Sequence, residues 1–274
     1  MTNTQAGLAE EPVLIEYNVE SGVAVLTLND PPANTYSYEM MQQLDRAILA
    51  ARMDDAVQVI VITGKGDKFF CAGADIQMLA NVTPTFKYYF CLHANETLNR
   101  LEQTPKLVIP AINGHCVGGG LEVAMAADIR IGRQAGGKMG LPEVSLGVLP
   151  GTGGTQRLVR IVGKSRAIEM MATGELFPFE VCRELGLIDR LLIADTGESL
   201  LNQVVEYARQ FTTPAKAAMA VGRIKRSVQT GAEIPLEYGL ALERELQQQL
   251  FQSEDAKEGL DAYVGKRKAE FKGK

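Results

Sequence analysis

The feature that most constrains the fold is a run rich in β-branched residues over positions 57–63, which ends at Gly64. A continuous apolar run of this length before a turn residue predicts a strand with both faces covered. Such strands belong to parallel sheets, whose neighbours need crossover connections that are usually helical and right-handed. We therefore predict a core of βαβ units, and neither a β-sandwich nor a helical bundle.

The segments around this strand repeat the alternation of strand and helix through the first two-thirds of the chain. The expected elements are a hairpin over 13–17 and 23–28 that turns at Glu20-Ser21-Gly22, a helix over 40–51 with Ser37 as its N-cap, a helix over 86–101, a strand over 107–112, a helix from Gly118 and a strand near Ile129.

The pattern changes near residue 198 to long helical stretches that break at Pro214 and Pro235. We predict that residues 12–197 form the core with the functional site, and that residues 198–274 form a helical oligomerisation region. Leu242, Leu246 and Leu250 lie on one face, which suits packing on the core and an oligomer interface alike. Residues 1–11 are expected to form a disordered tail.

Composition excludes several classes of partner. The 274 residues carry a formal net charge of -5, which gives no general attraction for nucleic acid or for an anionic membrane surface. No apolar run approaches the roughly 20 residues that span a bilayer, and residues 1–11 resemble no targeting peptide, so a cytoplasmic protein is expected. The four cysteines are too scattered for a metal or redox pair, and no metal site is predicted.

Three glycines, Gly118, Gly119 and Gly120, follow a predicted strand and open a predicted helix. Without Cβ atoms they leave backbone N–H groups accessible, and an oxyanion can approach the positive end of the helix dipole. Taken alone, the motif is explained better by a tight turn or a close helix–strand contact. Its spacing does not fit a dinucleotide fingerprint, and no Lys-Ser/Thr pair completes a P-loop.

Two carboxylates and a second small-residue segment are ambiguous when each is taken alone. Glu122 lies in the first turn of the predicted helix, where an acid is commonly a capping residue or a partner of the dipole. Glu143 follows a proline bend and is typical of an exposed loop acid. The segment 70–75 would let the backbone approach a ligand, and Asp75 suits the N-cap of a following helix.

In their order and spacing these segments resemble the enoyl-CoA hydratase/isomerase (crotonase) superfamily, and in particular its enoyl-CoA hydratase branch. The likeness covers nearly the whole chain, from residue 70 to the terminal segment 266–271. The matching segments are Phe70-Cys71-Ala72-Gly73-Ala74-Asp75-Ile76, Ile112-Asn113-Gly114, Gly118-Gly119-Gly120-Leu121-Glu122, Gly140-Leu141-Pro142-Glu143 and Leu149-Pro150-Gly151-Thr152-Gly153-Gly154-Thr155-Gln156-Arg157.

The resemblance implies an α/β fold, a crotonase-type spiral of ββα units with a helical C-terminal region, assembled as a homotrimer or homohexamer. It implies an acyl-CoA thioester as substrate, with CoA as part of the substrate and no separate cofactor. The backbone N–H groups of Ala74 and Gly119 would form an oxyanion hole, and Glu122 and Glu143 would hold and activate water. The residues implied in CoA binding are Ala72, Gly73, Ile76 and Lys266.

The expected reaction is the addition of water to a trans-2-enoyl-CoA, which gives a 3-hydroxyacyl-CoA. Because a helix N-terminus favours an anion, Glu122 is expected to act as base and Glu143 as proton donor to Cα. An enoyl-CoA isomerase, another superfamily lyase or hydrolase, and a non-catalytic acyl-CoA-binding or RNA-binding member remain alternatives. Tyr36 departs from the Asn-Ala-Leu type of pattern common in the family, which leaves acyl-chain preference open.

Overall fold

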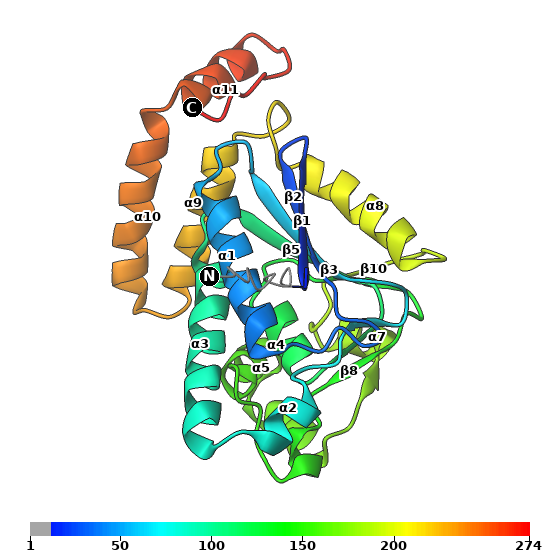
Figure 1. Ribbon diagram of the computed structural model, residues 1–274. Coiled ribbons are helices and arrows are strands. Elements are labelled where there is room, and N and C mark those ends of the chain that lie inside the picture. Colours follow the sequence, from blue (N-terminus) through cyan, green and yellow to red (C-terminus); the bar gives the residue numbers. More distant parts are fainter. Residues whose placement is uncertain (1–11) are drawn as a thin grey trace, which may run out of the picture.

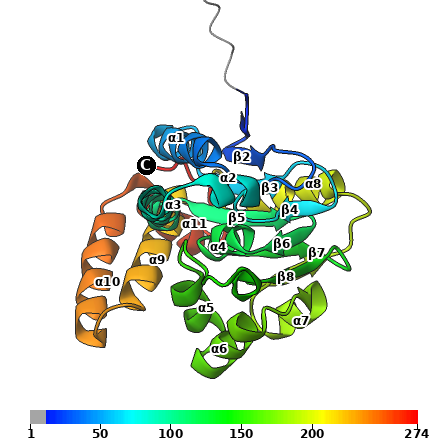
Figure 2. The same ribbon diagram turned by 60° about the horizontal axis from the view of Figure 1, so that its bottom comes forward.

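The computed structural model describes residues 12–274, and the tail predicted for residues 1–11 lies outside the described residues. The chain forms two β-sheets surrounded by helices (Figures 1 and 2). The larger sheet has six strands in the order β1 (Ile15–Glu20), β2 (Val23–Leu28), β3 (Val59–Gly64), β5 (Leu107–Ile112), β7 (Ile131–Arg133) and β10 (Arg190–Leu192).

Strands β1 and β2 form the predicted antiparallel hairpin, and every other pair in this sheet is parallel. The hairpin turns at Ser21 and Gly22, whose φ values of 49° and 82° are those of a type I′ turn. All six residues of β3 are buried, as its β-branched sequence predicts. The parallel α/β core expected from the sequence is therefore confirmed.

The second sheet consists of short strands that local periodicity did not predict, since a strand of three residues carries too little pattern. Strands β4, β6 and β8 are parallel, and β9 joins β8 in antiparallel fashion. Their bounds are β4 (Phe69–Cys71), β6 (His115–Val117), β8 (Lys138–Gly140) and β9 (Phe177–Pro178).

The two sheets are linked by a repeated unit. Strands β3, β5 and β7 of the large sheet lead into β4, β6 and β8 of the small one, and a helical segment follows each time. This repetition confirms the predicted spiral of ββα units. The helical segments that follow are α2 (Ile76–Asn81), α4 (Gly119–Met125) and the 3-10 turn η1 (Glu143–Leu146).

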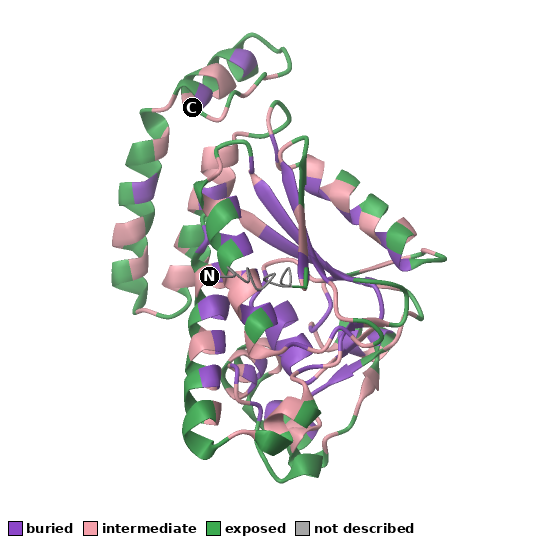
Figure 3. Cartoon of the chain, in the orientation of Figure 1, coloured by how far each residue is buried: buried purple, intermediate pink, exposed green. Residues whose placement is uncertain are grey.

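Helices bury both faces of the large sheet. Helices α1 (Tyr38–Met53), α3 (Pro84–Gln103) and α4 contribute to the main apolar core, and α4 is buried along its whole length (Figure 3). Ser37 caps α1 as predicted, because its side chain accepts a hydrogen bond from the Met40 N–H at 3.2 Å. Helix α8 (Gly197–Arg209), at the start of the predicted C-terminal region, covers the opposite face through Leu200, Val204 and Ala208.

The last three helices, α9 (Ala218–Gly231), α10 (Leu236–Phe251) and α11 (Glu254–Val264), extend along one side of the core (Figure 1). Lys225 of α9 fixes this arm to the core through an ion pair of 2.8 Å with Asp128. None of the helices in residues 12–274 is long and apolar enough to cross a membrane. The remaining helices are α5 (Gly154–Val162), α6 (Lys164–Thr173) and α7 (Phe179–Glu184).

Candidate active site

A cavity of about 260 Å³ lies beside the small sheet and brings together most of the residues singled out in the sequence. Backbone from the segments after β4 and β6 forms one part of its wall, and two glutamates form another. Apolar side chains complete the wall, so an apolar part of a ligand can lie against them. The apolar members are Ile76, Leu79, Leu146, Val148 and Leu149.

The backbone at this cavity includes Ala74 and Gly119. Ala74 forms an isolated parallel bridge with Tyr36, in which the Tyr36 N–H donates to Gly73 O at 2.9 Å and the Asp75 N–H donates to Tyr36 O at 3.1 Å. In this pattern the N–H of Ala74 itself points away from Tyr36. Gly119 is the first residue of α4, where helical N–H groups have no partner within the helix.

Glycine is required where these two segments meet. Gly118 has φ 56° and ψ −129°, a left-handed conformation that favours glycine. A Cβ on Gly73 would lie 3.0 Å from the Gly119 nitrogen, and a Cβ on Gly119 would collide with the Tyr36 hydroxyl. The absence of side chains therefore allows the Ala74 and Gly119 segments to approach backbone to backbone.

Glu122 of α4 is only 1% exposed, and protein donors surround its carboxylate. Its Oε1 atom accepts hydrogen bonds from the N–H groups of Thr152 and Gly154, each at 2.7 Å. Its Oε2 atom accepts a short hydrogen bond from the Thr152 hydroxyl. The carboxyl group of Glu122 therefore accepts three hydrogen bonds from residues 152 and 154.

Glu143 is the first residue of η1 and has a different environment at the same cavity. Its Oε1 lies 3.0 Å from where a Cβ on Gly118 would be, and its buried Oε2 has no hydrogen-bond partner in the described part of the chain. Burial, together with the charge of Glu122, raises the pKa of Glu143 to about 7. The two neighbouring carboxyl groups thus have different environments, which is the arrangement that acid–base chemistry needs.

The family model for enoyl-CoA hydratase/isomerase matches residues 18–274. The chain belongs to the enoyl-CoA hydratase/isomerase family.

Several relatives of this family member match over almost their full length. A short-chain-enoyl-CoA hydratase from Clostridium acetobutylicum is 34% identical over 92% of this chain and 94% of its own. A crotonyl-CoA hydratase from Syntrophomonas wolfei is 34% identical over 96% of this chain and 99% of its own. The crystal structure of an enoyl-CoA hydratase from Geobacillus kaustophilus superposes with a TM-score of 0.92 and 42% identity, covering 96% and 98% of the two chains.

The structure of this family member brings together Ala72, Gly73, Ala74, Ile76, Gly119, Glu122 and Glu143, all of which line the one cavity. Lys266 is separate from them. It follows α11, which lies at the opposite end of the molecule from α2 (Figure 1), and it is not part of the cavity wall. Within one chain, Lys266 therefore does not meet the other residues implied in CoA binding.

Local sequence reasoning gave no role to Thr152 and Gly154, although both hold Glu122. They lie about 30 residues from Glu122 in the chain, and small residues in a glycine-rich segment are typical of any turn. The available signal was the position of the segment 151–154 at a helix start, the same position that made the earlier glycines informative.

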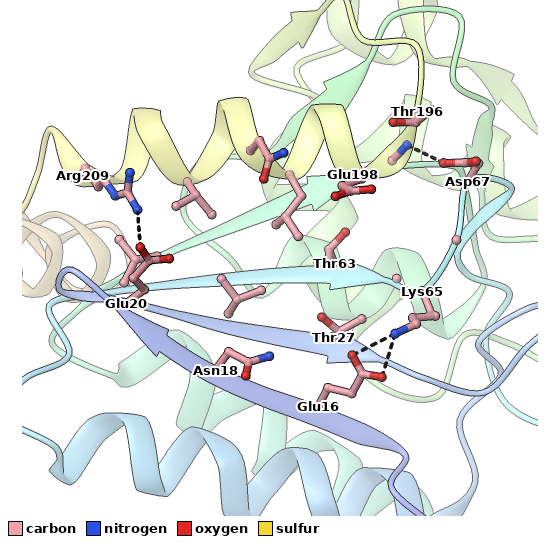
Figure 4. Close-up of a pocket in the computed structure, with 18 residues that line it drawn as sticks. Glu16, Asn18, Glu20, Thr27, Thr63, Lys65, Asp67, Thr196, Glu198 and Arg209 are labelled. Carbon is pink, nitrogen blue, oxygen red and sulfur yellow. Dashed lines mark hydrogen bonds and ion pairs between the residues drawn. The ribbon is translucent and has the colours of Figure 1, made fainter.

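A larger cavity of about 800 Å³ lies between α8 and strands β1 to β3 (Figure 4). Its two cationic side chains already pair with acids across it, Lys65 with Glu16 at 2.8 Å and Arg209 with Glu20 at 3.5 Å. It contains neither the glycine-rich backbone nor the carboxyl pair of the smaller cavity. In residues 12–274 no cluster of three or more His, Cys, Asp or Glu side chains is arranged to hold a metal ion.

Proposed function

We propose that this protein is an enoyl-CoA hydratase, which adds water to a trans-2-enoyl-CoA and forms a 3-hydroxyacyl-CoA. The observation that carries the proposal is the pair of glutamates at one cavity, Glu122 surrounded by hydrogen-bond donors and Glu143 with a pKa raised to about 7. We assign them the roles of base and acid beside the backbone N–H groups of Ala74 and Gly119. The hydratases among the relatives support the same reaction.

In the proposed mechanism the thioester oxygen accepts hydrogen bonds from the N–H groups of Ala74 and Gly119. Negative charge builds on that oxygen as the nucleophile bonds to Cβ and an enolate forms. Fixed donors in a cavity that excludes water stabilise such charge without reorganising, and one donor of this kind contributes about 3 kcal/mol in another enzyme. The positions of both residues in the cavity wall support this role.

Proton transfer is assigned to the glutamates. Glu122 accepts a proton from the water whose oxygen bonds to Cβ, and Glu143 gives its proton to Cα as the enolate collapses. The product gains one hydroxyl and one hydrogen, and the two carboxyl groups exchange protonation states. Solvent then restores them before the next turnover. The chemistry uses side chains and backbone alone and calls for no cofactor other than the CoA of the substrate.

Ala72, Gly73 and Ile76, at the same cavity wall, are proposed to contact the CoA part of the substrate. Lys266 can take part only if another copy of the chain supplies it, since it lies away from its own cavity. The exposed apolar side chains of the last three helices support such an assembly, which we propose to be a homotrimer or homohexamer. They include Ile224, Val228, Leu236, Tyr238, Leu240, Phe251, Leu260, Tyr263 and Val264.

All four cysteines are free thiols, and three of them are buried. Free thiols suit a reducing compartment, which supports a cytoplasmic location.

Light scattering on the protein as it elutes from a size-exclusion column would test the proposed homotrimer or homohexamer. A monomeric mass at micromolar concentration would contradict it.

The decisive experiment is to incubate the protein with trans-2-enoyl-CoA thioesters of different chain length and with their β,γ isomers. Loss of the conjugated-enoyl absorbance is followed together with product identity. A 3-hydroxyacyl-CoA product supports hydration. Shifted double bonds without hydroxyacyl product would establish an isomerase instead, and a shifted RNA probe with unchanged crotonyl-CoA would establish an RNA-binding member.

A further inference from the structure

Two buried hydroxyl groups, those of Tyr36 and Thr152, are linked in series to Glu122 in the wall of the cavity. The Tyr36 hydroxyl lies 3.0 Å from the Thr152 Oγ1 atom, which in turn contacts Glu122 Oε2. Both residues are buried, with Tyr36 4% and Thr152 5% exposed. We propose that Tyr36 and Thr152 are positioning residues that hold Glu122 as the base of the hydration reaction. This inference rests on the proposed hydratase function.

The direction of the hydrogen bonds follows from the protons available. An ionised carboxylate only accepts, so Thr152 must donate its single hydroxyl proton to Glu122. The hydroxyl of Thr152 then has no proton left for Tyr36, and Tyr36 must donate to it. The Tyr36 hydroxyl thus donates to the Thr152 Oγ1 atom, and this bond keeps the Thr152 proton directed at the carboxylate of Glu122.

The same bonds limit what Glu122 can still accept. Its Oε1 atom already receives two N–H groups, from Thr152 and Gly154, and its Oε2 atom receives the Thr152 hydroxyl. A carboxylate oxygen offers about two acceptor positions, so one position on Oε2 remains. We assign that remaining position to the attacking water, whose proton Glu122 removes.

The fold places the Tyr36 phenol with little freedom. Its backbone is fixed to Ala74 by the parallel bridge, and its ring packs against Phe90 with centroids 6.0 Å apart. The missing Cβ of Gly119 provides the space for its hydroxyl. Burial, with the charge of Glu122, raises the pKa of Tyr36 well above its ordinary value, so the phenol remains a neutral donor.

The titratable groups around Tyr36, Thr152 and Glu122 determine how the reaction rate depends on pH. Glu143 is the neighbour that titrates near neutrality, and its loss of a proton would set the alkaline limb of a pH–rate profile. The charged and titratable side chains that face Tyr36, Thr152 and Glu122 are Glu143 of η1, Cys71 of β4, Lys87 and Cys91 of α3, and Arg157 of α5. Arg157 donates to Thr152 O at 3.3 Å.

The test uses three variants that change single hydroxyl groups. Thr152→Val removes the hydroxyl and keeps both backbone donors and the side-chain shape, Thr152→Ser restores the hydroxyl, and Tyr36→Phe removes only the phenol oxygen. The pH profiles of kcat and kcat/KM are measured for hydration of crotonyl-CoA. Loss of a hydrogen bond to a charged group predicts a kcat lowered about ten- to a hundredfold in Thr152→Val.

The loss in Thr152→Val is expected in kcat, with KM little changed, because the Thr152 hydroxyl contacts Glu122. Thr152→Ser should keep kcat near the wild-type value. Tyr36→Phe should lower kcat by a smaller factor. The double variant Tyr36→Phe/Thr152→Val should match Thr152→Val alone, because Tyr36 acts on Glu122 only through Thr152.

Unchanged kcat in Thr152→Val and Tyr36→Phe, with altered KM only, would overturn the inference and make both residues part of the pocket wall. Additive effects in the double variant would overturn the relay through Thr152. If Thr152→Val does not fold, the kcat and KM of Tyr36→Phe still decide whether Tyr36 is a positioning residue or part of the pocket wall. A wild-type protein that forms no hydroxyacyl product would instead refute the proposed function itself.

Discussion

Two of the buried clusters of charge are built in opposite ways. Where α9 meets the core, Lys225 and Asp128 lie 2.8 Å apart, Lys225 also donates to Lys106 O at 3.0 Å, and Asp128 accepts from the Val108 N–H at 2.7 Å. At the candidate active-site cavity two carboxyl groups face the same space, and Glu143 Oε2 has no partner within residues 12–274.

The difference separates a structural use of charge from a chemical one. Burial lowers the pKa of Lys225 and raises that of Asp128, but each partner opposes the shift of the other. At the cavity burial raises the pKa of Glu143, and the charge of Glu122 reinforces the shift. Because nothing opposes the effect of burial as strongly at Glu143, this carboxyl group keeps its proton to higher pH and can act as a proton donor near neutral pH.

The largest expected effect is on catalysis at the cavity. Glu143→Gln keeps the shape of the side chain but has no proton to give to Cα, and general acid catalysis contributes about 10²- to 10⁴-fold. We expect hydration to fall below a hundredth of the wild-type kcat with crotonyl-CoA. Activity that stays above a hundredth of wild type would remove Glu143 from its proposed role.

The second effect concerns stability where α9 docks. Lys225→Met fills the same space but leaves Asp128 buried without its cation, which should lower the free energy of unfolding by about 3 kcal/mol. Urea denaturation measures the change. The matched control is Lys65→Met at the exposed pair with Glu16, where the loss should stay below about 1 kcal/mol. Equal losses in the two variants would mean that the buried pair has no special role.

A smaller effect is expected when both partners of the docking pair are replaced. Asp128→Asn/Lys225→Met removes the unpaired charge and keeps an acceptor for the Val108 N–H. Replacing a whole buried pair is often neutral, so the double variant should recover about half or more of the stability lost in Lys225→Met. A double-mutant cycle gives the coupling energy, and simple additivity would contradict it.

The smallest effect is a stability gain at the cavity. The pKa of Glu143 is raised to about 7 in the folded chain from 4.5, so the folded state binds a proton that the unfolded state releases between these values. Stability from this group therefore decreases as pH rises through that window. Glu143→Gln should become more stable than wild type above pH 7, by about 1 kcal/mol after allowance for partial exposure.

Calorimetric Tm values for both proteins at a series of pH values test this gain. Identical pH dependence in the two would show that Glu143 carries no burial cost. A variant that loses activity while it gains stability would establish that the cavity is strained for function.

Local sequence reasoning was most successful where the pattern was long. Strand β3, helix α1 with its Ser37 cap and helix α3 follow from periodicity, because a helix of several turns or a fully buried strand repeats its signal. The strands of the small sheet span three residues or fewer and show no period. Their pairing depends on segments that are distant in the chain.

The sequence by itself determined the family and the identity of the residues at the cavity, because the glycines, the glutamates and the spacing between them are properties of the sequence alone. Tertiary structure alone decided how these residues are partnered. The hydrogen bond between Tyr36 and Thr152 joins residues 116 positions apart, and the donors to Glu122 come from a loop 30 positions away. The directions of the side chains and the separation of Lys266 from the cavity depend on how the two sheets and the last three helices pack together. The local periodicity of the sequence does not encode that packing.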